Sequence, residues 1–339
     1  STGEGKMDKF RQTWIDCAKG LTISLVVLHH VKSGLRSTSV IPENLEIAFS
    51  LLSAARMPLF FLVAGFFAYG AMKAPLTKFI DGKVIHFLYF YVIWSLISIS
   101  LRSSLSNYTT NDVHFSEILL IFWQPTFTLW FIYALAICFC IARLTYRVDP
   151  RAQIIVAMAV SVAAWRFFGG DDDILMLKVI RFYPMFLIGM HFSSLIRSSV
   201  EGVTAGRLAV ATAILCCIAA IALWWDIILV PPFFYILALS LASVVLPVVY
   251  LGQDTVLGRV LGYIGKRSLY VYLMHFLPAA GSRVILNRLG VNDPVIVMAI
   301  GVPFTIATCL AAYEVLRKTA LSFLFERPAF SRIELPAAR

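Results

Sequence analysis

Charged side chains are scarce in this chain: Asp, Glu, Lys and Arg together make up 14% of its 339 residues. A soluble globular domain carries about a quarter charged residues, so the composition excludes an ordinary soluble protein. Hydrophobic residues reach 60% instead. They occur in repeated runs near the roughly 20 residues needed to cross a bilayer, which predicts a polytopic membrane protein.

Metal-binding and disulfide patterns are missing as well. The six cysteines form no CxxC motif and no Cys–His spacing typical of a metal site. All of them lie in apolar segments, so we interpret them as small buried residues without a disulfide framework. They are Cys17, Cys138, Cys140, Cys216, Cys217 and Cys309. The polar opening STGEGKMDKFRQ has no small-residue cleavage site after the first apolar run, so we expect no cleavable signal peptide.

Ten apolar ranges predict ten transmembrane helices in one all-α bundle. They are 14–31, 47–71, 84–101, 118–142, 153–165, 174–196, 208–225, 227–250, 268–285 and 294–316. The membrane domain then covers residues 14–318, between a cytoplasmic N-terminal segment, 1–13, and a cytoplasmic tail, 319–339. We expect Pro125 to start or kink the fourth helix, because proline cannot donate a backbone hydrogen bond.

The distribution of Lys and Arg predicts the orientation. With the N-terminus inside, 19 of the 29 Lys and Arg fall in cytoplasmic segments, 6 in outer segments and 4 within spans. Cytoplasmic loops collect these residues, so both termini are expected in the cytoplasm. The net charge of +10 is then mostly a consequence of topology, and we expect no nucleic-acid partner.

Ionisable residues interrupt the first span at a helical spacing. Lys19 and His30 are eleven residues apart, which is three turns plus about 20°, so they share a helix face. His29 is turned about 80° the other way. Lys19 is expected to pair with Asp16 at i, i+3 near the cytoplasmic boundary, and His30 lies about 16 Å further along the axis, toward the outer end.

Three more cations fall inside predicted spans: Arg56, Lys178 and Arg181. Insertion scales assign each central cation a cost of about 3 kcal/mol, so each is a functional candidate by default. The alternative for the two arginines is structural, with bonds to carbonyls of helices broken near Pro58 and Pro184.

Other polar residues also have two interpretations. Trp130 is an interfacial belt residue or a part of the site, and His275 is a packed histidine bonded to a backbone carbonyl or a part of the site. Asp171–Asp173 is interpreted as a solvated outer loop, and Glu314 is expected to pair with Arg317. Depth along the spans places four candidates in overlapping layers of the outer half: His30, Arg56, Trp130 and Arg181.

Five short motifs, in order, resemble the acyltransferase-3 family of integral membrane acyltransferases. They are IDCAKGLTISLVVLHHV with Lys19 and His30; RMPLFFLVAGFF with Arg56, Pro58, Phe60 and Gly65; TLWFIYAL with Trp130 and Tyr133; RFYPMFLIGM with Arg181, Phe186 and Gly189; and GKRSLYVYLMH with Ser268, Tyr272 and His275. Many members have Arg where this chain has Lys19. Several carry an appended hydrolase-like domain, and we expect none here.

The resemblance implies transfer of a short acyl group from acyl-CoA to a sugar hydroxyl in the bacterial inner membrane. The acceptor is expected to be an exopolysaccharide or other cell-surface saccharide, free or lipid-linked. Acetyl-CoA is the expected donor, and succinyl-CoA is an alternative because buried arginines suit a free carboxylate. No tightly bound cofactor and no metal are expected. Membrane lipid is an expected partner, and a second copy of this chain or a polysaccharide-assembly complex is a further candidate partner.

The same resemblance suggests roles for the candidates. His30, Arg56 and Arg181 are predicted to be catalytic, with the histidine as base and the cations stabilising negative charge. Donor or substrate binding is predicted for Lys19, Asp16, Trp130, Tyr133, Lys178, Tyr272 and His275. A transporter or flippase for a lipid-linked saccharide is the rival from another class, since buried cations and broken helices suit it too. A scaffold in polysaccharide assembly is a third interpretation.

Overall fold

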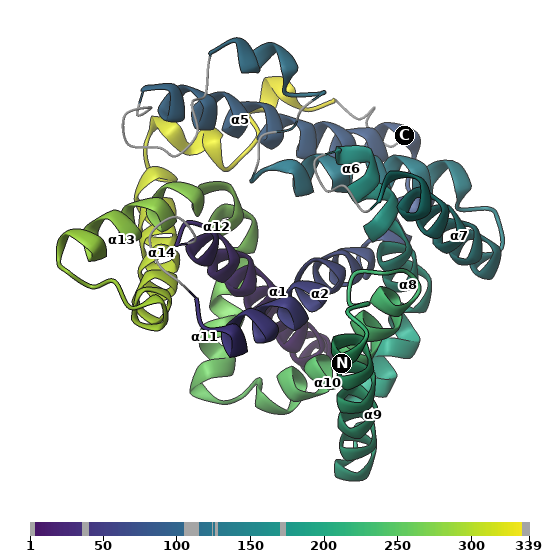
Figure 1. The fold of residues 1–339 in the computed structure, drawn as a ribbon. Coiled ribbons are helices and arrows are strands. Elements are labelled where there is room, and N and C mark those ends of the chain that lie inside the picture. The colour runs from purple at the N-terminus through teal and green to yellow at the C-terminus, as the bar shows by residue number, and fades with distance from the viewer. Residues whose placement is uncertain are drawn as a thin grey trace. The chain divides into compact units, whose positions relative to one another are not determined.

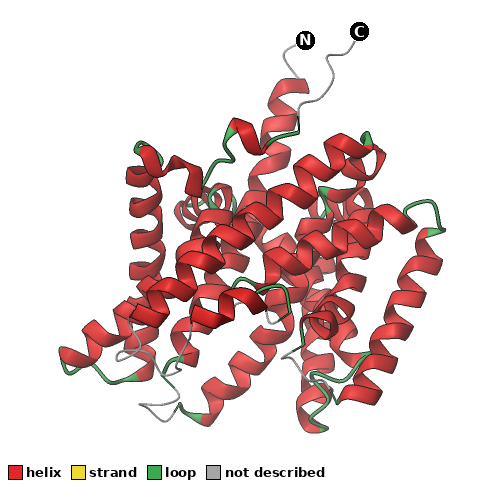
Figure 2. Ribbon diagram, turned by 90° about the horizontal axis from the view of Figure 1, so that it is seen from above, coloured by secondary structure: helices red, strands yellow, loops and turns green. Residues whose placement is uncertain are grey.

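The computed structural model describes residues 4–35, 41–104, 115–123, 125, 128–169 and 174–333. Within these ranges every regular element is a helix and none is a strand, as Figure 2 shows. The all-α prediction is therefore confirmed. The chain forms two compact units, Ser1–Phe66 with Ile188–Ala312 and Phe67–Leu187 with Tyr313–Arg339, which are taken one at a time below.

The first unit is built around the N-terminal helix. Its helices are α1 (Glu4–Ser33), α2 (Glu43–Gly65), the second part of α8 (Leu175–Glu201), α9 (Ala205–Trp224), α10 (Phe233–Gly252), α11 (Val256–Lys266), α12 (Ser268–Met274), α13 (Phe276–Arg288) and most of α14 (Pro294–Leu316). Helix α1 contacts α2, α10, α11, α12 and α13, and Figure 1 shows it in purple among them. Its apolar side chains are correspondingly buried, with Trp14 and Val27 fully inaccessible.

Small residues let α1 and α11 approach closely. A Cβ on Gly265 would lie 1.7 Å from the backbone oxygen of Asp16, so the two backbones touch there. Next to this contact the thiol of Cys17 donates to the carbonyl oxygen of Gly258 over 3.1 Å. Close backbone approach through small residues is how membrane helices pack without a hydrophobic driving force between them. This contact holds the N-terminal half of α1, which is predicted to lie toward the cytoplasm, in a fixed position.

The second unit contains shorter and more irregular helices. They are α3 (Ala68–Lys73), α4 (Leu76–Phe79), the π-helical turn η1 (Ile80–Ile85), α5 (His86–Ser104), the 3₁₀ helix η3 (Phe115–Leu120), α6 (Trp130–Thr145), α7 (Pro150–Phe168), the first part of α8, and the 3₁₀ turns η4 (Ala320–Leu324) and η5 (Ala329–Ser331). Helix α7 has a strong start signal, because the Asp149 side chain accepts from the backbone N–H groups of Arg151 and Ala152. Pro150 occupies its first turn, where a missing N–H costs least.

Each predicted span overlaps at least one helix, but the count of ten membrane crossings is not confirmed. Seven described helices are long and apolar enough to cross a bilayer, or eight if α12 and α13, bent by 59°, form one broken span. Helix α6 is not among the seven because it has only 16 residues. Helix α1 is not among them either, and Lys19 and the two histidines interrupt its apolar run. The location of both termini in the cytoplasm likewise stays a prediction.

Two predicted boundaries were wrong, and α1 is longer than the predicted first span. The fourth span was expected from residue 118, whereas α6 begins at Trp130, after η3 and the segment that holds Pro125. Residues 251–267 were expected as a loop but contain α11, whose glycines pack against α1. Helix α1 begins at Glu4 and so extends through most of the predicted segment 1–13. The acidic triplet Asp171–Asp173 lies outside the described residues.

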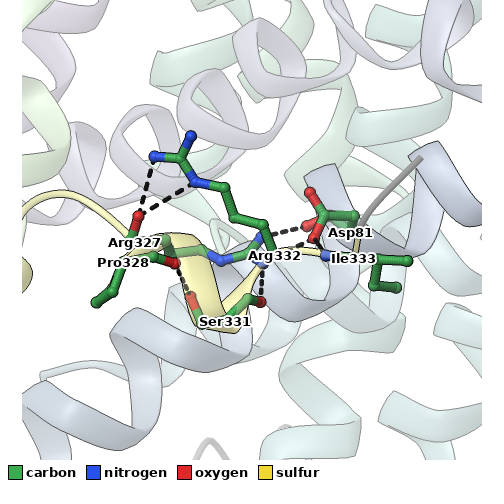
Figure 3. Close-up of polar contacts among 6 residues, drawn as sticks. All are labelled: Asp81, Arg327, Pro328, Ser331, Arg332 and Ile333. Carbon is green, nitrogen blue, oxygen red and sulfur yellow. Dashed lines mark hydrogen bonds and ion pairs between the residues drawn. The ribbon is translucent and has the colours of Figure 1, made fainter. Parts of the chain in front are cut away.

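The C-terminal segment is attached to the second unit by Arg327 (Figure 3). Its guanidinium donates to the side chain of Asp81 over 2.7 Å and to the backbone oxygen of Asp81 over 2.6 Å. The N–H of Ile333 donates to the same carboxylate over 2.9 Å. The Arg327 side chain is only 5% exposed, so this ion pair is largely removed from solvent. Residues 319–333 of the predicted tail thus belong to the second unit, and their end packs against Asp81.

Replacing Arg327 by methionine should destabilise this attachment. Asp81 would lose its buried cation, so we expect the free energy of unfolding of the second unit to fall by about 1–3 kcal/mol and the segment after η4 to become more sensitive to protease. The matched control is Arg317→Met, which removes the more exposed pair with Glu314, 2.6 Å apart. That control should cost less than about 1 kcal/mol. Equal losses in both variants would contradict the buried role of Arg327.

Candidate functional site

Two histidine rings meet in the first unit. His30, near the C-terminal end of α1, has its ring centroid 4.9 Å from that of His275, and the two planes are tilted by 47°. The neighbouring ring of His29 is 5.2 Å from His30 at 77°. Its Nε2 lies 3.5 Å from the Ser33 hydroxyl. His30 is half-buried.

His275 lies where one helix stops and the next begins. Helix α12 ends at Met274 and α13 begins at Phe276, with a bend of 59° between them. Pro278 explains the break, because it has no N–H to donate to the Met274 carbonyl and its ring would clash with that group in a continuous helix. The bend directs the side chain of His275 toward α1 and His30.

The hydrogen bonds of His275 assign its tautomer. Its Nδ1 lies 2.7 Å from the carbonyl oxygen of Tyr272, so Nδ1 carries the proton and donates. Nε2 is then a free acceptor, and it has no hydrogen-bond partner within the described part of the chain, although the side chain is fully buried. The predicted bond from His275 to a backbone carbonyl is confirmed. Tyr272 supplies this carbonyl, and its ring lies 5.8 Å from the imidazole.

Arg283 is a neighbour of His30 that the sequence-based prediction missed. Its Nη1 donates to the backbone oxygen of His30 over 2.7 Å. Gly34 makes room for the guanidinium, since a Cβ at that position would lie 1.8 Å from Arg283 Cζ. In the sequence Arg283 is one of the six cations assigned to outer segments, and a straight helix through residues 268–285 gives no reason for it to turn toward α1. The signal was His275 followed three residues later by Pro278, which marks the bend.

Arg56 also lies near His30. It is on α2, within electrostatic reach of the His30 ring, as is Arg283. Its side chain is partly buried and makes no ion pair or hydrogen bond with any residue that the structure describes. The first unit therefore brings together a histidine pair and two guanidinium groups, a set that can take up a proton and stabilise negative charge. We call His30, His275, Arg56 and Arg283 the histidine cluster.

The other end of the predicted face of α1 carries the expected ion pair. Lys19 Nζ is 3.1 Å from the Asp16 carboxylate, which confirms the i, i+3 prediction. The Lys19 side chain remains 30% exposed, so it is accessible to a ligand. Beyond the histidines, Lys32 pairs with Glu46 of α2 over 2.6 Å and links these two helices.

The remaining candidates lie in the second unit, where Trp130 is the centre of an aromatic and cationic contact. Its ring stacks on Phe182 with centroids 5.9 Å apart, and the ammonium of Lys178 lies 4.9 Å from the Trp130 ring. Arg181, the neighbour of Phe182 on α8, is buried with 8% of its surface exposed. We call Trp130, Phe182 and Lys178 the tryptophan cluster. The proposed overlap in depth of Trp130 and Arg181 with His30 stays a prediction.

Tyr133 belongs to the packing of the second unit. It stacks on Tyr91 of α5 with ring centroids 4.9 Å apart and planes within 16°. The Tyr91 hydroxyl in turn donates to the backbone oxygen of Ile121. This stack joins α6 to α5, so the contacts of Tyr133 describe a structural role beside the predicted one in binding.

A cavity of about 320 Å³ in the same unit is a poor candidate for the chemistry. It lies between α6, α7 and α8 and is lined almost entirely by apolar side chains, with Thr145, Gln153 and Tyr183 as its polar groups. None of the predicted site residues lines it. It offers no group that is ionised near neutral pH, so we place the candidate active site at the histidine cluster.

These features define a class: an α-helical, multi-pass membrane protein whose first unit holds a histidine pair with two arginines nearby. Comparison with known families then gives the assignment. The model of the family described as "Acyltransferase domain" matches residues 12–314, and the chain therefore belongs to the acyltransferase-3 family. It is an acyltransferase of the membrane. Comparisons with curated proteins and with solved structures gave no match.

Proposed function

We propose that this protein transfers a short acyl group from acyl-CoA to a hydroxyl of a bacterial cell-surface polysaccharide or exopolysaccharide, or of its lipid-linked precursor. Acetyl is the proposed group and succinyl the alternative, and the bacterial inner membrane is the proposed location. Membership of the family supports acyl transfer in general. The observation that carries the proposal is the contact between the half-buried His30 and the fully buried His275.

His30 is assigned the role of general base. A sugar hydroxyl is a poor nucleophile, and a neutral imidazole can remove its proton as the oxygen attacks the thioester carbon. The new C–O bond gives a tetrahedral oxyanion. When that intermediate collapses, the C–S bond breaks and the CoA thiolate takes the proton from the imidazolium of His30. Atoms and charges then balance, with an ester and free CoA as products.

Arg56 is assigned to the oxyanion. Its guanidinium has no counter-ion within the described residues and lies near His30, so it is available for negative charge that develops during the reaction. Arg283 and His275 are positioning residues. Arg283 donates to the backbone carbonyl oxygen of His30 and so holds the backbone there. The ring of His275 packs against the imidazole ring of His30.

Residues outside the histidine cluster are proposed to bind the donor or the acceptor. Lys19, paired with Asp16 at the predicted cytoplasmic end of α1, would attract the phosphates of acyl-CoA. The tryptophan cluster, together with Arg181 and Tyr133, is proposed to bind the acyl group or the sugar. An acyl group with a free carboxylate would suit Arg181 or Lys178, which is why succinyl-CoA stays a candidate donor. A homodimer or an assembly complex stays a proposed partner.

Chemical analysis of the acceptor tests the proposal directly. Surface polysaccharide from cells with and without the protein should differ by the mass of one acyl group per modified sugar, and that mass identifies the group. Purified protein should release CoA from acetyl-CoA or succinyl-CoA only when acceptor is added. Movement of a lipid-linked saccharide without CoA release would instead favour the transporter, and no difference in either assay would contradict the proposal.

A further inference from the structure

The cavity of about 320 Å³ in the second unit is a groove along helix α7. It is lined by side chains of α6, of α7 with the turn before it, and of the first part of α8. Helix α7 is loosely packed, since only Gln153 and Ser161 of its 19 residues are buried. The groove has an open side, because Val156, Val160 and Met176 line it with 61%, 46% and 50% of their surfaces exposed.

The two ends of this groove differ in chemistry. The end at the α6–α7 turn contains Thr145 and Gln153, and Gln153 Nε2 donates to the backbone oxygen of Val148 over 2.8 Å. Val160 lies seven residues further along α7, or about 10 Å along the axis. The lining residues of α7 and α8 away from the turn are all apolar: Val156, Ala157, Val160, Met176, Val179 and Ile180. A site of this kind suits a molecule with a polar end and a hydrocarbon chain.

A buried hydroxyl group lies at the polar end. Tyr183 lines the groove and is 9% exposed, and its hydroxyl forms no hydrogen bond of normal geometry with the residues that the structure describes. Thr145 lies close to this hydroxyl, but the Thr145 hydroxyl donates its own proton to the backbone oxygen of Ile141 over 3.0 Å. A hydroxyl without a partner is unfavourable in an apolar site. An acceptor oxygen supplied by a ligand would satisfy it.

Two exposed arginines flank the same end. Arg147 and Arg151 each precede a residue that lines the groove, Val148 and Ala152 respectively. Asp149 is the only acidic residue in 141–160, and its carboxylate accepts from the backbone N–H groups of Arg151 and Ala152. The polar end is therefore beside a net positive charge. Arginines at the ends of membrane helices extend to the level of the lipid head groups, where they attract phosphate.

The order of cations, hydroxyl donor and apolar wall matches an anionic glycerophospholipid. Its phosphate would meet the arginines, an ester carbonyl oxygen would accept from Tyr183, and a fatty acyl chain would fill the apolar part. A polyprenyl phosphate has the phosphate and the chain but no ester carbonyl, so it would leave the Tyr183 hydroxyl without an acceptor. A helix of a second copy would supply neither the negative charge nor a free carbonyl oxygen, because its backbone groups are bonded internally.

We propose that the groove between α6, α7 and α8 binds one anionic glycerophospholipid, with its phosphate at Arg147 and Arg151 and an acyl chain along Val156, Ala157 and Val160. The distribution of Lys and Arg predicts that the α6–α7 turn faces the cytoplasm, so the lipid would belong to the inner leaflet. The site shares no residue with the histidine cluster. Its occupation does not depend on the proposed acyl transfer, and the bound lipid would fill the space that separates α7 from its neighbours.

Native mass spectrometry of the full-length protein in detergent tests the site. The protein is titrated with phosphatidylglycerol, phosphatidylcholine or a polyprenyl phosphate, and the fraction that carries one lipid gives the Kd. Phosphatidylglycerol should bind about tenfold more tightly than phosphatidylcholine, and the double variant Arg147→Gln/Arg151→Gln should reduce this preference to within about threefold. Ala157→Phe, which places a ring in the groove, should weaken phosphatidylglycerol binding by about tenfold or more, and Tyr183→Phe by about three- to tenfold.

The matched control is Ala159→Phe. It is the same substitution on the same helix, but Ala159 is exposed, does not line the groove and is turned about 200° from Ala157, so affinity should change less than about twofold. Phosphatidylglycerol should raise the melting temperature of the unchanged protein and of Ala159→Phe but not that of Ala157→Phe. Tyr183→Phe keeps the shape of the side chain, so it decides the question if Ala157→Phe does not fold.

Three results would overturn the inference. The first is unchanged affinity for phosphatidylglycerol in folded Ala157→Phe and Tyr183→Phe. The second is tighter binding of the polyprenyl phosphate than of phosphatidylglycerol, lost in Ala157→Phe, which would assign the groove to a lipid-linked saccharide. The third is a change from dimer to monomer in Ala157→Phe with lipid affinity unchanged, which would assign the groove to a second copy of this chain. Each result leaves the proposed acyl transfer standing, because none of these assays measures it.

Discussion

Replacing His30 by alanine is expected to abolish acyl transfer while leaving CoA binding intact. The variant keeps Lys19, which is proposed to attract the phosphates of the donor, but loses the imidazole that takes the hydroxyl proton. Removal of a general base lowers turnover by about 10²–10⁴-fold. Turnover is measured as acceptor-dependent CoA release from purified protein, and CoA affinity is measured by calorimetry on the same preparation.

His29→Ala is the matched control for this experiment. His29 is adjacent in sequence, yet its ring is turned away from the Lys19 face of α1 and lies next to the Ser33 hydroxyl. Its loss should reduce turnover by less than about fivefold if the ring takes no part in proton transfer. Turnover in His30→Ala close to that of the unchanged protein would rule out His30 as the base. A larger effect from His29→Ala than from His30→Ala would exchange their roles.

The substitution Gly265→Ala, which adds one methyl group, is expected to prevent normal packing of α1. The new Cβ would lie 1.7 Å from the Asp16 carbonyl oxygen and 2.9 Å from the Gly20 nitrogen. These are backbone atoms, which no rotamer change can move, so α1 and α11 would have to separate. We expect Gly265→Ala to lower the free energy of unfolding by about 3 kcal/mol, seen as a lower melting temperature and a smaller monodisperse fraction in detergent.

Gly281→Ala controls for the intrinsic effect of the substitution. Gly281 is also inside a helix, and beyond its chain neighbours and the nearby backbone of that helix no heavy atom of the described residues lies within 4 Å of its added Cβ. Alanine has a higher helix propensity than glycine by about 1 kcal/mol, so this variant should be as stable as the unchanged protein or slightly more stable. If Gly265→Ala proved equally harmless, the close contact of α1 with α11 would be contradicted.

Local spacing predicted ion pairs between residues three positions apart. The pairs Lys19–Asp16 and Arg317–Glu314 follow from the 3.6-residue repeat, and the structure contains both. Apolar runs of sufficient length likewise predicted a helix at every proposed span. These features depend on residues a few positions apart, so a single sequence contains them in full.

Features that depend on contacts between distant segments could not be read from the sequence. The contact of His30 with His275 joins positions separated by most of the chain, and it depends on the direction of a bend that Pro278 permits but does not specify. Arg283 was missed for the same reason. Helix α11 was missed because its polar residues and its glycines are also typical of a loop between spans. The glycines are explained by the close approach of α1, which the sequence does not reveal.

The break at His275 also restricts how this part of the chain can vary in length. Arg283 follows His275 by eight residues, two helical turns and about 80°, and this rotational phase brings the guanidinium to the backbone of His30. One inserted or deleted residue in 276–282 would turn Arg283 by about 100° and shift it by about 1.5 Å along the axis. The number of residues between His275 and Arg283 is therefore fixed by the geometry of the site.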